Sequence, residues 1–259
     1  MNSLALTLST RAKGFVLDVQ DFTFFTVNAM GSLRSALRYR RDSIEQMYLI
    51  GVQALFIVLL SGLFMGMILA IESGHRLETF GAKLLVGRTV ALGMVRELGP
   101  VITGLMLAAR NGSKNAAELG SMRVSEQIDA LKAFGTDPIQ KLVAPRLFAS
   151  LVMFLPLTIL ADAIGVIGGL VVSDLWLQID PSFYWLSAIN GLRMKDLVVG
   201  FAKPFVFGVT ISVISCYYGI NTTGGTVGVG RSTINSVVVS SVMILFADFI
   251  FTKIIWELL

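Results

Sequence analysis

Long apolar runs, separated by shorter polar segments, dominate the pattern of the chain. The runs cover Met47–Ile71, Thr89–Ala109, Leu147–Val172, Leu197–Ile220 and Ile234–Trp256. Each is close to the roughly 20 apolar residues that a helix needs to cross a bilayer. None alternates apolar and polar positions as a membrane-spanning strand would. The pattern predicts an all-α membrane protein with about five transmembrane helices, and Gly62-x-x-x-Gly66 in the first run predicts a close helix contact.

The N-terminal part of the chain differs from these runs. Residues Phe15 to Leu33 are apolar at helical spacing but are interrupted by Asp18, Asp21 and Asn28. Such a segment is typical of a helix lying in the membrane interface, with a poor first span as the alternative. A basic cluster suited to anionic headgroups follows at Arg34, Arg38, Arg40 and Arg41. We therefore expect residues 1–46 to form an interfacial elbow and residues 47–259 a single transmembrane domain.

A charged amphipathic stretch lies between two of the apolar runs. Met122, Ile128, Leu131 and Phe134 form an apolar stripe at near-helical spacing, and Arg123, Glu126, Asp129 and Lys132 take the polar side. Gly135 and the Asp137-Pro138 pair end the pattern. The spacing predicts one short helix outside the membrane, over about residues 121–135. Because short helices need packing to persist, either the bilayer surface or a partner protein must support it.

Composition agrees with a membrane environment. Of the 259 residues, 54% are hydrophobic and only 15% are charged, and the mean hydropathy is +0.76. Water-soluble domains usually carry about 25% charged residues, so the bilayer is the favoured solvent and no large soluble domain fits. The net charge of +4 is modest and its bases lie in loops, which predicts no nucleic-acid partner.

The distribution of charge predicts the orientation. Bases exceed acids in the polar segment from Arg110 to Arg146, which places it on the cytoplasmic side by the positive-inside rule. Acids exceed bases between Ser173 and Asp196, where aromatic residues suit the outer interface. With the N-terminus cytoplasmic, five crossings put the C-terminus on the outer side.

Ionisable residues inside the apolar runs are costly in a bilayer and usually functional. They include Arg96, Glu97, Asp162, Lys203 and Asp248. Arg96 and Glu97 point about 100° apart on one helix, so each is expected to find a partner on another helix or in a cavity, and Pro100 is expected to bend or break their helix. Asp162 and Asp248 could pair with Lys203 or Arg96, either as structural bonds or as a proton or ion relay.

The sequence gives little support for metal binding, catalysis or nucleotide binding by this chain. His75 and Cys216 are the only residues of their types, so we predict no histidine or cysteine metal site within one chain. We also find no catalytic arrangement and predict that the chain is not an enzyme. The stretch from Gly225 to Ser232 follows the spacing of a P-loop with Arg231 in place of lysine. Apolar runs flank it, so we expect a flexible inner turn over Gly219–Arg231.

Two long blocks of sequence resemble one known family. They are VRELGPVITGLMLAARNGSKNAAELGSMRVSEQIDALKAFGTDP, from Val95 to Pro138, and YYGINTTGGTVGVGRSTINSVVVSSVMILFADF, from Tyr217 to Phe249. Both are similar to the MlaE (YrbE) permeases, the membrane subunits of ABC transporters associated with MCE proteins. The resemblance covers nearly the whole chain from Gly51 onward.

The resemblance implies a homodimeric permease of the bacterial inner membrane. It would work with a separate cytoplasmic ABC ATPase that binds ATP and Mg, with no cofactor in this chain. It would move phospholipid between the inner membrane and a periplasmic MCE protein, and so maintain the lipid composition of the outer membrane. The alternative is an ion-coupled secondary transporter or channel that uses Asp162, Lys203 and Asp248.

The resemblance also implies roles for particular residues. The lipid pocket maps to Leu69, Leu77, Phe80, Arg96 and Glu97. The helix that couples to the ATPase maps to Met122, Arg123, Glu126, Asp129 and Phe134. In such a pocket the lipid phosphate would favour a cation such as Arg96.

Overall fold

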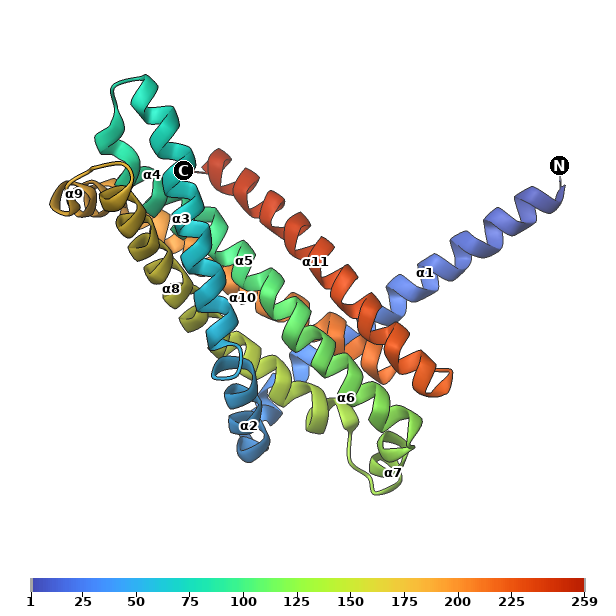
Figure 1. The fold of residues 1–259 in the computed structure, drawn as a ribbon. Helices are drawn as coiled ribbons and strands as arrows, with labels where there is room; N and C mark the ends of the chain where they lie inside the picture. The colour runs from blue at the N-terminus through green and yellow to red at the C-terminus, as the bar shows by residue number, and fades with distance from the viewer. Residues whose placement is uncertain (1, 259) are drawn as a thin grey trace.

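The structure is a computed structural model that describes residues 2–258, and within them the side chains of residues 16–254 and 257. Its regular secondary structure in this part of the chain is helical throughout (Figure 1). Five helical segments are long and apolar enough to cross a membrane: Arg40–Thr79, Lys83–Val124, Ile139–Leu175, Met194–Ile220 and Gly225–Ile254. The predicted fold class and the predicted number of spans are therefore confirmed.

Several of these segments are built from more than one helix. The first joins α2 (Arg40–Gly51) to α3 (Leu55–Thr79). The second joins α4 (Val86–Gly93), α5 (Gly99–Leu107) and α6 (Ser113–Val124) through the π-helical turns Met94–Leu98 and Ala108–Gly112. The third runs from the π-helical turn Ile139–Val143 into α8 (Ala144–Leu175), and the last two are α10 (Met194–Ile220) and α11 (Gly225–Leu258). The remaining elements are α1 (Asn2–Gly31), α7 (Gln127–Ala133), α9 (Pro181–Gly191) and 3-10 turns at Ser32–Leu37 and Lys83–Leu85.

Successive spans run in opposite directions. The start of α2, the α6–α7 corner and the turn between α10 and α11 lie at one end of the bundle (Figure 1). The turn between α3 and α4, the short helix α9 and the C-terminal end of α11 lie at the other end (Figure 1). The C-terminus therefore lies at the opposite end from α7, as five crossings require.

Glycines bring α3 and α8 into backbone contact. A side chain on Gly62 would meet the backbone of Ala161, and one on Gly66 would collide with the carbonyl of Gly165. The Gly62-x-x-x-Gly66 spacing on α3 thus faces a matching Ala161-x-x-x-Gly165 spacing on α8. This confirms the close helix contact that the sequence predicts.

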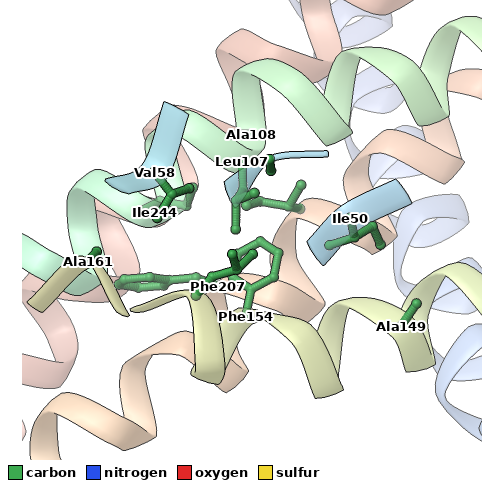
Figure 2. Close-up of a cluster of buried hydrophobic side chains, with 12 residues drawn as sticks. Ile50, Val58, Leu107, Ala108, Ala149, Phe154, Ala161, Phe207 and Ile244 are labelled. Atoms are coloured by element: carbon green, nitrogen blue, oxygen red, sulfur yellow. The ribbon is translucent and has the colours of Figure 1, made fainter. Parts of the chain in front are cut away.

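A compact apolar core joins the spans near the middle of the bundle. Phe154 from α8 and Phe207 from α10 pack together with Leu107 from α5 and Ile244 from α11 (Figure 2). Ile50 from α2 and Val58 from α3 belong to the same buried cluster. Because six helices contribute, this core fixes the spans relative to one another.

The N-terminal helix α1 is not among the segments that qualify as membrane spans. Its C-terminal part packs on the bundle. The rings of Phe22 and Phe25 lie edge-on to the ring of Tyr217, with 5.2 and 5.6 Å between the ring centroids. Ala29 is fully buried. The N-terminal part of α1 extends away from the spans (Figure 1). This arrangement fits a helix that lies along the membrane interface beside the α7 end of the bundle.

The expectation of a flexible turn over Gly219–Arg231 is wrong. Helix α10 continues to Ile220 and α11 begins at Gly225, so the turn comprises only residues 221–224. Positive φ angles in this stretch are confined to Gly224 and Gly225. The later glycines take helical geometry because the apolar run that follows them extends the helix back over this stretch. A P-loop is excluded, since its phosphate-binding residues would have to form a loop.

Candidate functional site

An open groove of about 520 Å³ runs along α4 at the α9 end of the bundle. Its lining residues are Leu77, Leu85, Arg88, Thr89, Leu92, Gly93, Arg96 and Glu97. All but Leu77 recur every three or four residues and so form one face of a helix. The groove is mainly apolar and carries its charges at separate points along its length, an arrangement suited to an amphiphile.

The groove contains three of the five residues to which the sequence assigns lipid binding. Leu77, Arg96 and Glu97 line it. Leu69 lies directly behind the lining, because a side chain on Gly93 would meet its Cδ2 atom at 2.8 Å. Phe80 does not line the groove; it follows the last residue of α3, and 82% of it is exposed.

The sequence reasoning missed the other five lining residues, which are Leu85, Arg88, Thr89, Leu92 and Gly93. Their helical periodicity with Arg96 and Glu97 was a signal that could have identified them. Lys83 and Arg88 obscure this signal because they interrupt the apolar pattern of the stretch.

The two adjacent charges of the groove, Arg96 and Glu97, have partners on α10. Glu97 accepts a hydrogen bond from the fully buried Lys203 at 2.5 Å. Lys203 also lies 2.8 Å from Asp248 and donates to Thr252 at 3.2 Å, both on α11. Arg96 forms an ion pair with Asp196 at 3.4 Å. The expected partners on other helices, and the pairing of Asp248 with Lys203, are thus confirmed.

Pro100 does not break the helix. The run from Lys83 to Val124 remains one helical segment. The turn before Pro100, Met94–Leu98, is π-helical, and the N–H of Gly99 donates to the carbonyl of Met94. The wider turn accommodates the proline ring, which would otherwise clash with the preceding turn. Arg96 and Glu97 both belong to this π-helical turn.

The expected pairing of Asp162 with Lys203 or Arg96 is wrong. Asp162 is buried on α8, and neither of its carboxylate oxygens has a hydrogen-bond partner in the described part of the chain. It packs against Gly99, where an added side chain would collide with it. Lys203 instead binds Glu97 and Asp248. Asp162, Lys203 and Asp248 therefore do not form a continuous relay.

The predicted coupling segment is two helices and not one. Helix α6 ends at Val124, α7 begins at Gln127, and Glu126 between them has a φ of 60° in the left-handed region. Arg123 donates to both carboxylate oxygens of Asp129, at 2.6 and 2.7 Å. In a straight helix, the side chains of residues six apart would differ in direction by about 120° around the helix axis. The bend therefore brings this pair together, and the hydrogen bond from Arg123 holds the pKa of Asp129 below its ordinary value.

A small apolar hollow of about 220 Å³ lies at this bend. Met122, Gln127, Ala130, Leu131 and Phe134 line it. Phe134 is 86% exposed, whereas Ile128 is fully buried and does not contribute to the exposed stripe. The coupling residues from the sequence therefore form an exposed corner: Met122 and Phe134 line the hollow, Arg123 and Asp129 pair beside it, and Glu126 makes the bend.

The described residues contain no cluster of three or more histidine, cysteine, aspartate or glutamate side chains that could hold a metal ion. Five bilayer-length helices, an amphiphilic groove at one end and an exposed apolar corner at the other define a multi-span membrane permease. The family profile "Permease MlaE" matches residues 43–254. The chain therefore belongs to the MlaE permease family.

Relatives with assigned names agree with this membership. A Rickettsia felis protein named "Probable ABC transporter permease protein" is 37% identical over 255 residues, or 98% of each chain. The Haemophilus influenzae "Intermembrane phospholipid transport system permease protein MlaE" is 37% identical over 214 residues, or 82% of each chain. The Arabidopsis thaliana "Protein TRIGALACTOSYLDIACYLGLYCEROL 1, chloroplastic" is 40% identical over 217 residues, which cover 84% of this chain and 62% of the plant protein.

Proposed function

We propose that the chain is the permease subunit of an ATP-driven phospholipid transporter. It acts between the inner membrane and a periplasmic MCE protein and helps to maintain the lipid composition of the outer membrane. A separate cytoplasmic ABC ATPase binds ATP and Mg and hydrolyses the nucleotide. The names of the relatives support the transporter class and, for the Haemophilus protein, the phospholipid substrate.

One observation carries the proposal: the groove and the exposed corner lie on the same helical segment. The run Lys83–Val124 has 42 residues and is interrupted by no break. Leu85, Leu92 and Arg96 near its start line the groove. Met122 near its end lines the apolar hollow beside α7. A displacement imposed at the corner is therefore transmitted along a helix to the groove wall.

The groove residues suggest how a phospholipid binds. The leucines Leu77, Leu85 and Leu92 provide a surface for acyl chains, since burial of apolar area there is favourable. The arginines of the groove provide donors for a headgroup phosphate. The groove is open on one side, so a second copy of the chain would enclose the lipid, with Leu69 and Phe80 near the edge of that interface. Homodimer formation is part of the proposal.

The α6–α7 corner is proposed as the docking element for the ATPase. Phe134 offers an exposed apolar anchor and Met122 a partly exposed one, and Glu126 and Asp129 are exposed in the same corner. Closure of the ATPase dimer would shift this corner and squeeze the groove, releasing lipid toward the opposite end. This orientation puts α7 and the N-terminus in the cytoplasm and the C-terminus in the periplasm.

The test is a charge reversal at the corner with a matched control. Glu126→Lys with Asp129→Lys should abolish co-purification of the ATPase and lipid transfer in reconstituted vesicles. Glu72→Lys with Glu78→Lys makes the same change in charge at the other end of the bundle and should leave both intact, because these exposed carboxylates pair only with nearby cations on the surface. Retention of ATPase binding and transfer in the corner variant would reject the docking assignment.

The buried cluster of Glu97, Lys203 and Asp248 favours one alternative, an ion-coupled secondary transporter or channel. The two functions differ in their need for nucleotide. Purification under mild conditions should yield a stoichiometric ATPase partner, and lipid transfer should stop when ATP is withheld. Transport driven by an ion gradient, without an ATPase, would instead support the alternative.

A further inference from the structure

The charged residues that line the groove are not equivalent. Glu97 pairs with Lys203 at 2.5 Å, and Arg96 pairs with Asp196 at 3.4 Å. Arg88 lines the same groove, yet within the described residues its guanidinium has neither an ion pair nor a hydrogen-bond partner. Of the charged residues that line the groove, Arg88 is thus the one without an ionic partner in the described part of the chain.

Arg88 is nevertheless held in place. Its Cα, Cβ and Cγ atoms lie against Gly191 at the end of α9, where any added side chain would collide with them. Packing of the aliphatic stem restricts the rotamers of a side chain that lines the groove. An arginine that only stabilised α9 would donate hydrogen bonds to the last carbonyls of that helix, and Arg88 donates none in the described structure.

The position of Arg88 suits the headgroup of an amphiphile. It lies eight residues before Arg96, which corresponds to about 12 Å along a helix. Leu85 and Leu92 lie on the same face, about one turn on either side of Arg88. A phosphate at Arg88 would therefore be flanked by apolar surface that can receive acyl chains.

We propose that Arg88 is the headgroup-selecting residue of the groove and makes it prefer phospholipids with a net negative charge over zwitterionic ones. This inference rests on the proposed lipid-transport function and names its substrate class. Both lipid classes carry a phosphate, but the amine of a zwitterionic headgroup would bring a second positive charge close to a guanidinium that has no carboxylate partner in the described structure. An anionic headgroup such as phosphatidylglycerol cancels the charge of Arg88 and accepts its hydrogen bonds.

The experiment uses the complete transporter in nanodiscs that contain phosphatidylglycerol and phosphatidylethanolamine in equal amounts. Lipids retained by the purified protein are quantified by native mass spectrometry. The wild-type protein should be enriched in phosphatidylglycerol, and Arg88→Gln should lower the enrichment by about tenfold, as expected for one lost charge-assisted hydrogen bond. Arg88→Lys keeps the charge and should keep most of the enrichment.

The control is Arg76→Gln, which removes a cation at the same end of the bundle but outside the groove, where Arg76 pairs with Glu72. An equal loss of enrichment in this variant would mean that bulk surface charge attracts the lipid, and would overturn the assignment of Arg88. Unchanged enrichment in Arg88→Gln would overturn it as well. If Arg88→Gln fails to fold, Arg88→Lys still tests the assignment, since a loss of enrichment with the charge retained would contradict it.

Two further outcomes separate this inference from the function on which it rests. If no lipid is retained by the wild-type protein or any variant, the lipid-transport proposal itself fails. If soluble glycerol 3-phosphate displaces the retained lipid at equimolar concentration, the site recognises a phosphate ester alone, and the selection of a lipid is wrong. Retained lipid that resists glycerol 3-phosphate and loses its headgroup bias only in Arg88→Gln supports the proposal.

Discussion

Lys203 on α10 and Glu97 in the groove wall form an ion pair at 2.5 Å, although the side chain of Lys203 is completely buried. Lys203 also forms an ion pair with Asp248. Loss of the lysine therefore leaves two carboxylates without a cation, whereas Glu97→Gln leaves Lys203 paired with Asp248. Removal of one member of a buried ion pair typically costs about 3–5 kcal/mol. We expect Lys203→Met to lower the melting temperature of the detergent-solubilised protein far more than Glu97→Gln does. Equal effects would contradict the role of Lys203 as the shared partner.

Gly66 should tolerate no side chain. Its Cβ would collide with the carbonyl of Gly165, so Gly66→Ala must separate α3 from α8 and should destabilise the protein by about 1–3 kcal/mol. Gly230→Ala on α11 is the control, because nothing lies within 4 Å of the added atom. Alanine is the better helix former by about 1 kcal/mol, so the control should be neutral or stabilising. Thermal unfolding of both variants checks this, and a harmless Gly66→Ala would contradict the close contact.

Glu126 holds the bend between α6 and α7 in a conformation that favours glycine, with a φ of 60°. A left-handed conformation costs a residue with a side chain about 1–2 kcal/mol. Glu126→Gly should therefore increase the protection of α7 amides in hydrogen-exchange experiments, and Glu126→Val, which is β-branched, should decrease it. If the two variants change the protection of the α7 amides in the same direction, the left-handed conformation at residue 126 does not control the stability of α7.

Filling the groove should exclude lipid without unfolding the bundle. Leu92 lines the groove and is partly exposed, so the larger ring of Leu92→Trp would occupy space proposed for an acyl chain. We expect less lipid to co-purify with this variant, measured by mass spectrometry. Ile159→Trp places the same ring on the exposed surface of α8 and serves as the control. Similar amounts of retained lipid in both variants would argue that the lipid binds elsewhere.

The fold was largely predictable because the bilayer imposes simple rules on the sequence. The five apolar runs are long enough to span, and the described residues contain five such segments. The Gly62 and Gly66 spacing predicted a close contact, although only the structure shows that its partner is Ala161 and Gly165 on α8. Local composition does not reveal which helix faces a glycine, because that depends on the packing of the whole bundle.

The bend at Glu126 could not be read from the sequence. Met122, Ile128, Leu131 and Phe134 keep helical spacing through the bend, and no glycine or proline marks it. One interaction favours it: Arg123 donates to Asp129. A continuous helix would not bring these two side chains together, because residues six apart point about 120° from each other.

The candidate site was only partly predictable for a related reason. The resemblance to known permeases led to Leu77, Arg96 and Glu97, which line the groove. It did not lead to Arg88, because only the folded structure shows that the guanidinium has no ion-pair partner among the described residues. The partners of Lys203 and the isolation of Asp162 likewise depend on how the helices are rotated about their axes.

The two π-helical turns at Met94–Leu98 and Ala108–Gly112 enclose α5, the middle section of the segment that joins the groove to the corner. Each such turn contains one surplus residue relative to an α-helix. Migration of that surplus residue past α5 would turn this section by about 100° around its axis while the hydrogen-bonded rod stays intact. A helix built in this way can transmit rotation about its axis, as well as movement along its axis, from one end to the other.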